Sequence, residues 1–321
     1  MENTINSVEL KEKTPLKRST KRTIFYVIVM ALPILQFLIF YVYVNFSVIL
    51  MAFKKYTEAE NGLGYDTIFA GFQNFKAVFE VFKTGDNITM LWTSFAASGM
   101  SIFISMPLAL LFSFYVYKKC FMSGFFKVIL FLPQIVSTIV LSLIFKYIAT
   151  DVYVNIFGVE AGLFATEKTA YPTLFIYTLW SGFGVNILLY SGAMSGINDS
   201  IVESAELDGV NSMQEFWYIT FPMIFSTFVT FLVTSISHIF SNQLHLYTFF
   251  GENTSMKTVG YYLFVQSYLA GPTSCVNPAS GTVYLSYPEI SAFGLMITLV
   301  VFPTTLLIRH LLQKYGPRTD K

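Results

Sequence analysis

Charged residues are scarce in this chain. They make up 12% of its 321 residues, whereas 54% of the residues are hydrophobic. A soluble domain carries about a quarter charged residues, so a chain of this length cannot cover a water-facing surface with so few. We therefore expect most of its surface to face membrane lipid. The net charge of +1 also gives no electrostatic reason to bind nucleic acid.

Cysteine is nearly missing. The two cysteines, Cys120 and Cys275, stand far apart in the chain. Neither belongs to a CxxC pair or to a cysteine and histidine cluster, so the sequence predicts no metal site. The expected topology places the two cysteines on opposite sides of the membrane, which excludes a disulfide between them.

A phosphate-binding loop is missing as well. The nearest match runs from Gly251 to Thr258, but Met256 stands where the second glycine should be. Without that glycine the loop cannot present its backbone amides to a phosphate. We therefore expect that the chain is not an enzyme that hydrolyses ATP and that it holds no cofactor of its own.

Long hydrophobic runs, in contrast, are abundant. A helix needs about 20 apolar residues to cross the hydrocarbon core. Six runs meet this length: Ile24–Phe46, Leu91–Tyr117, Phe126–Ile148, Tyr171–Ala193, Phe221–Leu244 and Glu289–Leu312. The first is too long for the core of a signal peptide. The sequence thus predicts an all-α, polytopic membrane protein with about six transmembrane helices.

Lysine and arginine indicate the orientation of these helices. The two chain ends and the loop between the second and third runs hold 13 of the 20 basic residues, and three other loops hold six. Cytoplasmic loops carry the excess of Lys and Arg. We therefore expect a plasma-membrane protein with a cytoplasmic basic tail (1–22), a transmembrane domain (23–313) and a cytoplasmic C-terminal tail (314–321).

One loop, at about 194–222, has no Lys or Arg. It carries five acidic residues instead: Asp199, Glu203, Glu206, Asp208 and Glu215. Apolar residues recur in it near helical spacing and Gly209 interrupts them, which predicts a short amphipathic helix, a glycine turn and a second short helix. Such a helix could lie on lipid, but interfacial helices are usually rich in Lys and Arg. The acidic composition favours a protein partner.

The sequence of this loop resembles the EAA loop of ABC importer permeases. That pattern is EAA, a glycine four residues on, and then I-x-L-P; Ser204 and Phe221 are mild departures from it. The resemblance implies a coupling helix that sits in a groove of an ATPase subunit. It assigns ATPase coupling to seven residues: Glu203, Ser204, Ala205, Asp208, Gly209, Ile219 and Pro222.

Three further segments are similar to the first permease of maltose-type carbohydrate importers. They are Leu179–Asn186, Gly71–Phe75, and Phe131–Pro133 with Ser137. The resemblance implies the type I permease fold of ABC importers and a neutral sugar or oligosaccharide as substrate. It also implies a second permease subunit, an ABC ATPase dimer that binds ATP and Mg²⁺, and an extracytoplasmic sugar-binding protein. It weakens over 248–288, where a long outer loop replaces a usually shorter one.

The middles of the six runs contain no Asp, Glu, Lys or Arg. Intramembrane charges usually mark ion or proton pathways. Their absence disfavours a secondary carrier or channel that acts without an ATPase, and it disfavours a charged substrate. An amino acid or phosphate ABC permease is disfavoured by the sugar-type segments.

Polar residues do occur at mid-depth in the fourth and fifth runs. Ser235, His238 and Asn242 are spaced as one face of a helix. The fourth run offers Gly182, Asn186 and Tyr190, with Trp180 one turn toward the outside. The family resemblance places sugar contacts on these two helices, so these seven residues are the candidate substrate path. The alternative is that they form hydrogen bonds between helices and stabilise the packing.

Overall fold

The computed structural model describes residues 18–59, 64–83, 85–252, 254–276 and 283–317. The chain divides into one unit up to Met51 and a second from Ala52 onward. Of the predicted N-terminal tail, residues 1–17 lie outside the described residues, and Arg18 already begins a helix. Residues 318–321 of the predicted C-terminal tail also lie outside them.

The described part of the first unit, residues 18–51, is one continuous helix. It comprises α1 (Arg18–Gln36), the π-helical η1 (Phe37–Tyr43) and α2 (Val44–Met51). The apolar stretch Thr20–Met51 has 32 residues, more than the predicted run and enough to cross the hydrocarbon core.

The second unit begins with a β-hairpin and a short helix. Strands β1 (Lys54–Glu58) and β2 (Tyr65–Phe69) pair antiparallel, and α3 (Gln73–Lys83) follows. The buried amide of Asn74 donates hydrogen bonds to the carbonyls of Ala52 (2.8 Å) and Lys54 (2.7 Å). The Gly71–Phe75 segment therefore fixes the start of the hairpin to α3.

The second predicted span is confirmed. Its helices are α4 (Gly85–Met100), the π-helical η2 (Ser101–Ser105) and α5 (Met106–Tyr117). Ile88–Tyr117 forms an apolar stretch of 30 residues. The π-helical turn ends two residues before Pro107, which has no backbone N–H to donate to that turn.

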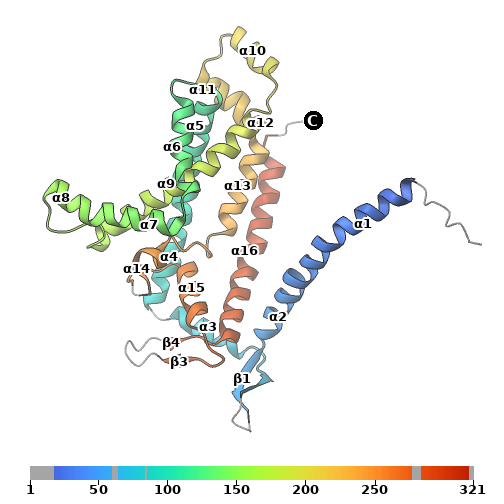
Figure 1. Cartoon of the computed structure of the whole chain (residues 1–321), viewed down its shortest axis with the longest axis vertical. Coiled ribbons are helices and arrows are strands. Elements are labelled where there is room, and N and C mark those ends of the chain that lie inside the picture. The colour runs from blue at the N-terminus through green and yellow to red at the C-terminus, as the bar shows by residue number, and fades with distance from the viewer. Residues whose placement is uncertain (1–17, 60–63, 84, 253, 277–282, 318–321) are drawn as a thin grey trace, which may run out of the picture. The chain divides into compact units, whose positions relative to one another are not determined.

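The third predicted span is wrong as one helix. Helix α6 (Ser123–Ile135) ends where Val136 adopts an extended backbone, and α7 (Thr138–Tyr147), η3 (Ile148–Val152) and α8 (Tyr153–Phe157) follow. Figure 1 shows α6 running beside α5, whereas α7 and α8 leave it sideways. Pro133 removes a backbone donor from the last turn of α6, and hydropathy alone does not report the resulting change of direction.

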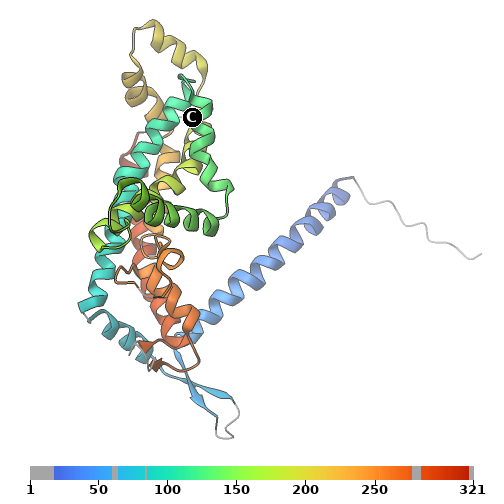
Figure 2. The ribbon, with the colours of Figure 1, turned by 60° about the vertical axis from the view of Figure 1, so that its left-hand side comes forward.

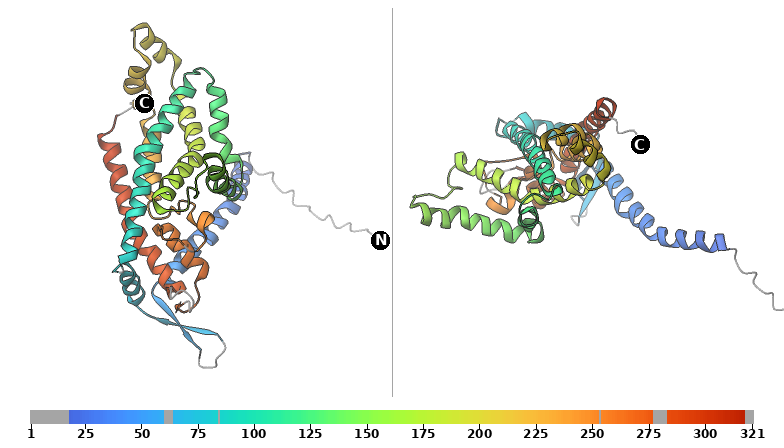
Figure 3. Two further views of the ribbon diagram at one scale, coloured as in Figure 1. Left: turned by 90° about the vertical axis from the view of Figure 1, so that its left-hand side faces the viewer. Right: turned by 90° about the horizontal axis from the view of Figure 1, so that it is seen from above.

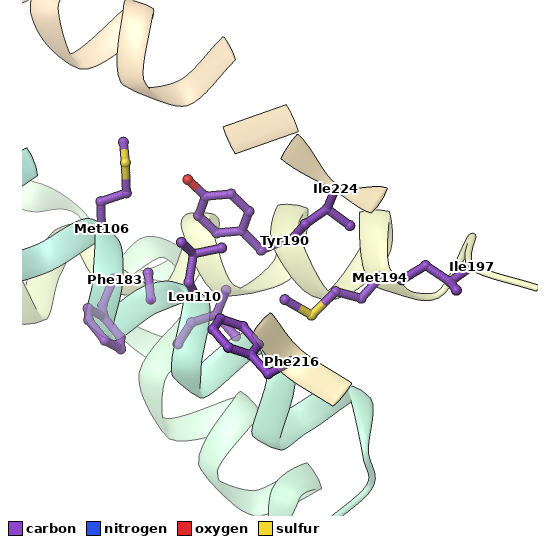
Figure 4. Packing of buried hydrophobic residues seen from close by; sticks show 10 residues of the cluster. Met106, Leu110, Phe183, Tyr190, Met194, Ile197, Phe216 and Ile224 are labelled. Atoms are coloured by element: carbon purple, nitrogen blue, oxygen red, sulfur yellow. The ribbon is translucent and has the colours of Figure 1, made fainter. Parts of the chain in front are cut away.

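The fourth span, α9 (Glu167–Met194), packs against α5 in the main apolar core. Figure 4 shows Leu110 of α5 beside Phe183 and Tyr190 of α9. The acidic loop (residues 195–220) also contributes to this cluster. Phe216, near the end of the loop, and Ile224, just after it, pack in the same cluster.

The fifth predicted span, Phe221–Leu244, is helical over its middle part but wrong at both ends. The stretch Ser212–Met223, which ends with α12 (Phe221–Met223), meets α13 (Phe225–Ser237) at a bend of 73°. Helix α13 ends at Ser237, and the chain turns through left-handed residues Leu244 and His245 before α14 (Leu246–Phe250).

The remainder of the chain forms α15 (Val259–Leu269), the short strands β3 (Cys275–Val276) and β4 (Val283–Tyr284), and α16 (Tyr287–Tyr315). Part of the long loop at 248–288 is thus helical. Glu289 accepts hydrogen bonds from the backbone and hydroxyl of Ser286 and closes a capping box at the start of α16.

The architecture is mostly helical, with five apolar helices long enough to cross a membrane, or six if the bent pair is one span, among the described residues. The all-α expectation is confirmed as a class, but it missed the two small hairpins. Figures 2 and 3 show the β1–β2 hairpin and the acidic loop (residues 195–220) at opposite ends of the second unit.

Candidate functional site

The acidic loop folds as the sequence predicts. Helix α10 (Asp199–Leu207) is capped by Asn198, whose side chain accepts a hydrogen bond from the backbone N–H of Ser200. Gly209 has a φ of +79°, a conformation that residues with a side chain rarely adopt. Helix α11 (Ser212–Glu215) begins with a capping box between Asn211 and Gln214, and η4 (Phe216–Thr220) follows.

The residues assigned to ATPase coupling differ in how far they are exposed. Glu203, Ser204, Asp208 and Gly209 are exposed, Ala205 is buried, and Ile219 and Pro222 are half-buried. Sequence reasoning missed Leu207, whose side chain is 90% exposed at the end of α10. Its position next to Asp208 in an amphipathic helix was the available signal.

A second candidate site is a cavity of about 140 Å³ between α9, η2 and the turn that follows α13. Three of the predicted path residues, Gly182, Asn186 and Asn242, line it together. The other residues in its wall are Ala97, Met100, Ser101, Ser105, Phe175, Thr178, Leu179 and Leu244. Among these described lining residues none is charged, and hydroxyl and amide groups supply the polarity.

Hydrogen-bonding capacity is left unused at this cavity. The hydroxyl of Thr178 is buried and has no partner within the described part of the chain. Within the described ranges, the side chain of Asn186 makes one hydrogen bond, a long one of 3.4 Å to the carbonyl of Gly182. A buried polar group without a partner is costly, so the cavity suits a ligand that supplies hydrogen-bonding groups.

Asn242 reaches the cavity in a way that the sequence did not indicate. It was predicted on the helical face with Ser235 and His238, and that prediction is wrong because α13 ends at Ser237. Asn242 instead lies in a turn, where its side-chain oxygen accepts a hydrogen bond from the N–H of Leu244 (2.9 Å). The Thr258 hydroxyl donates to the carbonyl of Asn242 (2.8 Å). These two bonds fix the residue while its side-chain N–H₂ has no partner in the described ranges.

The other predicted path residues lie elsewhere. Tyr190 is 1% exposed inside the main apolar core, and Trp180 packs against the cluster around Tyr177. Ser235 is half-buried on α13, and the exposed ring of His238 lies 3.0 Å from the hydroxyl of Ser241. None of these four is among the lining residues. Their role in the substrate path stays a prediction.

Sequence reasoning missed Ser101 and Ser105. They are four residues apart in the π-helical turn of the second span, and both line the cavity. Two hydroxyls at this spacing within a long apolar run were the signal. π-Helical turns occur often at functional sites. No group of three His, Cys, Asp or Glu side chains suited to a metal ion occurs in the portion of the chain that is described.

Comparison with known proteins adds a family and a fold. Residues 101–321 match the family model described as "Binding-protein-dependent transport system inner membrane component". The chain is 25% identical to the arabinooligosaccharides transport system permease protein AraP of Bacillus subtilis (strain 168), over 85% of this chain and 84% of that one. It is 27% identical to AmyD of Thermoanaerobacterium thermosulfurigenes, a probable permease for starch degradation products, over 74% of this chain and 82% of the relative.

Among solved structures, the chain resembles one from a bacterial ABC transporter involved in the import of the acidic polysaccharide alginate. The TM-score is 0.72, with 19% identity, over 93% of this chain and 98% of that chain. At this level of identity the similarity concerns the fold.

Proposed function

Since the chain belongs to the family of binding-protein-dependent transport system inner membrane components, we propose that it is one permease subunit of an ATP-driven importer of a neutral sugar or oligosaccharide. It is a multi-pass membrane protein and a transport component rather than an enzyme.

The observation that carries the proposal is the uncharged polar cavity. A charged solute would need a counter-charge in a region of low dielectric, and the described lining residues offer none. Hydroxyls and amides from Ser101, Asn186 and Asn242 suit the hydroxyl groups of a carbohydrate. The names of AraP and AmyD, which refer to oligosaccharides and starch products, support the same substrate class. We assign the substrate path to Gly182, Asn186 and Asn242, with Ser101 and Ser105 added.

The acidic loop supports the second half of the proposal, which is coupling to a separate ATPase. Glu203 and Leu207 of α10 and Asp208 directly after it are exposed, and the positive φ of Gly209 lets the chain turn back toward the membrane. In this proposal α10 docks on an ABC ATPase dimer, which binds the ATP and Mg²⁺. A second permease completes the path, and an extracytoplasmic sugar-binding protein delivers the sugar.

The orientation belongs to the proposal as well. If the acidic loop meets an ATPase, the end of the second unit that carries it is cytoplasmic, in agreement with the distribution of Lys and Arg. The β1–β2 hairpin then lies on the outer side.

A pull-down tests the proposal. The full-length tagged permease, purified in mild detergent from its own organism, should bring down an ABC ATPase identified by mass spectrometry. A secondary carrier or channel would bring down none, and that result would overturn the proposal. In the same cells Asn242→Ala should lower oligosaccharide uptake several-fold, since a lost hydrogen bond costs about 1 kcal/mol. The neighbouring amide variant Gln243→Ala should transport at the parent rate, because Gln243 does not line the cavity.

A further inference from the structure

Lys118 joins three segments of the cytoplasmic end of the permease. It follows directly after α5, and its Nζ lies 2.9 Å from a carboxylate oxygen of Glu206 in α10 and 3.0 Å from one of Glu215 in α11. Its side chain is 21% exposed, and that of Glu215 is 3% exposed. A single lysine thus ties both helices of the acidic loop to the end of the second span.

The electrostatics favour a charged lysine at this position. Partial burial disfavours the charge, but hydrogen bonds to Glu206 and Glu215 outweigh it and raise the pKa of Lys118 above its ordinary value. Lys118 therefore carries its charge throughout the neutral pH range. Packing continues the connection: Phe216, directly after Glu215, lies against Phe114 of α5 with ring centroids 5.2 Å apart.

The other end of the connection is the cavity. Lys118 terminates the span that begins with α4, and the π-helical turn of this same span places Ser101 and Ser105 in the cavity wall. One continuous helical rod, Ile88–Tyr117, therefore runs from the wall of the candidate sugar site to the acidic loop. A contiguous path of packed and hydrogen-bonded groups is the physical basis on which two distant sites influence each other.

We propose that Lys118 is the positioning residue that transmits movement of the acidic loop to the cavity wall. The proposal rests on the function proposed above, since it takes the acidic loop as the ATPase docking site. When the ATPase displaces α10 and α11, the two ion pairs pull α5 along with them, and the wall at Ser101 and Ser105 shifts. Without the ion pairs, the loop still docks, but α10 is no longer tied to the end of α5 and the wall at Ser101 and Ser105 does not follow its movement.

The test follows the cavity wall rather than transport, so the identity of the sugar is not needed. In a permease with Cys120 and Cys275 replaced by serine, Ser101→Cys reports the exposure of the wall to a small thiol reagent. The permease is purified together with its ATPase, and this complex is labelled with the thiol reagent in the presence and in the absence of ATP and Mg²⁺. In the Ser101→Cys variant, ATP should change the rate of thiol labelling by about fivefold or more. Fivefold is the lower end of the usual range of allosteric coupling between two sites. Adding Lys118→Met should abolish the change while the ATPase still co-purifies at the parent level.

Matched variants separate transmission from folding. Lys118→Met leaves the buried Glu215 carboxylate unpaired, so the double variant Lys118→Met with Glu215→Gln removes both charges and should also lose the response to ATP. Lys118→Arg keeps both ion pairs and should keep the response. Lys127→Met is the control, because Lys127 is an exposed lysine on α6 for which the described residues provide no ion pair.

Each possible result of these experiments supports or overturns the proposed role of Lys118. An unchanged response to ATP in the double variant would overturn the role of Lys118 in transmission. Loss of the ATPase, or failure to accumulate in the membrane in both the single and the double variant, would overturn it too, because Lys118 would then shape the docking site or the fold. If the parent complex itself retained no ATPase, the proposed function would fail rather than this inference.

Discussion

Gly184 in α9 lies directly against the backbone of Phe131 in α6. A methyl group added at Gly184 would lie 2.5 Å from the carbonyl oxygen of Leu130 and 2.7 Å from the Cα of Phe131. Both atoms belong to a helix backbone, which cannot move aside as a side chain can. The close contact of α6 and α9 at this level therefore requires glycine.

Gly184→Ala should destabilise the permease, because overpacking costs about 1–3 kcal/mol. The matched control is Gly192→Ala in the same helix, where an added methyl group meets nothing within 4 Å. That variant should be neutral or more stable by up to about 1 kcal/mol, because alanine favours helix more than glycine does. Thermal unfolding of the two purified variants in detergent measures the difference. Equal midpoints would show that α6 and α9 are not in contact at Gly184.

Gly209 is required for its backbone conformation and not for lack of space, since its φ is +79° and an added methyl group would meet no atom within 4 Å. Gly209→Val should therefore distort the turn at a cost of about 1–2 kcal/mol and reduce the amount of co-purified ATPase. Gly209→Asn should retain the ATPase, because asparagine adopts this conformation more readily. If valine and asparagine behave alike in the pull-down, the geometry of this turn does not determine docking.

Thr258 holds the turn that presents Asn242. Its buried hydroxyl donates to the carbonyl of Asn242 and accepts from the N–H of Tyr261 at 3.0 Å. Thr258→Val removes both hydrogen bonds and leaves two backbone groups unpaired, at a cost of about 1–3 kcal/mol. We expect lower oligosaccharide uptake from this variant and near-parent uptake from Thr258→Ser, which keeps the hydroxyl. Parent-level uptake by Thr258→Val would exclude a role for this bond in holding Asn242.

The two cysteines test the orientation without any added residue, since both are exposed. In sealed cells Cys275 should react with a membrane-impermeant thiol reagent, and Cys120 should react only with a permeant one. Cys120→Ser and Cys275→Ser identify which residue carries the label. Reaction of Cys120 with the impermeant reagent would reverse the proposed orientation.

Local signals in the sequence predicted the acidic loop well. The turn at Gly209 and the spacing of apolar residues are both local features of the loop, so no distant contact was needed to foresee α10 and α11. The long apolar runs likewise indicated the spans at α5, α9 and α16, because their length alone meets the thickness of the membrane.

The broken spans could not be foreseen in the same way. Hydropathy does not change where α6 ends at Ile135, although the backbone changes direction there. The polar residues that follow Ser237 were interpreted as one face of a continuing helix, whereas α13 ends at that residue. For the candidate site, Asn242 was chosen because of a helical spacing that does not exist, and it reaches the cavity through a turn held by Thr258. Ser101 and Ser105 were missed because their position beside α9 depends on tertiary packing.

The position of Asn242 in a turn, and not in a helix, affects how related permeases can come to prefer different sugars. An insertion of one residue within a helix rotates everything beyond it by about 100° and turns its apolar face away from its neighbours. A turn between α13 and α14 can lengthen, shorten or change its side chains without rotating either helix. Differences in sugar preference between relatives should therefore accumulate at Ser241, Asn242 and Gln243 of this turn rather than at Phe240 and Leu244, whose side chains pack into the apolar clusters.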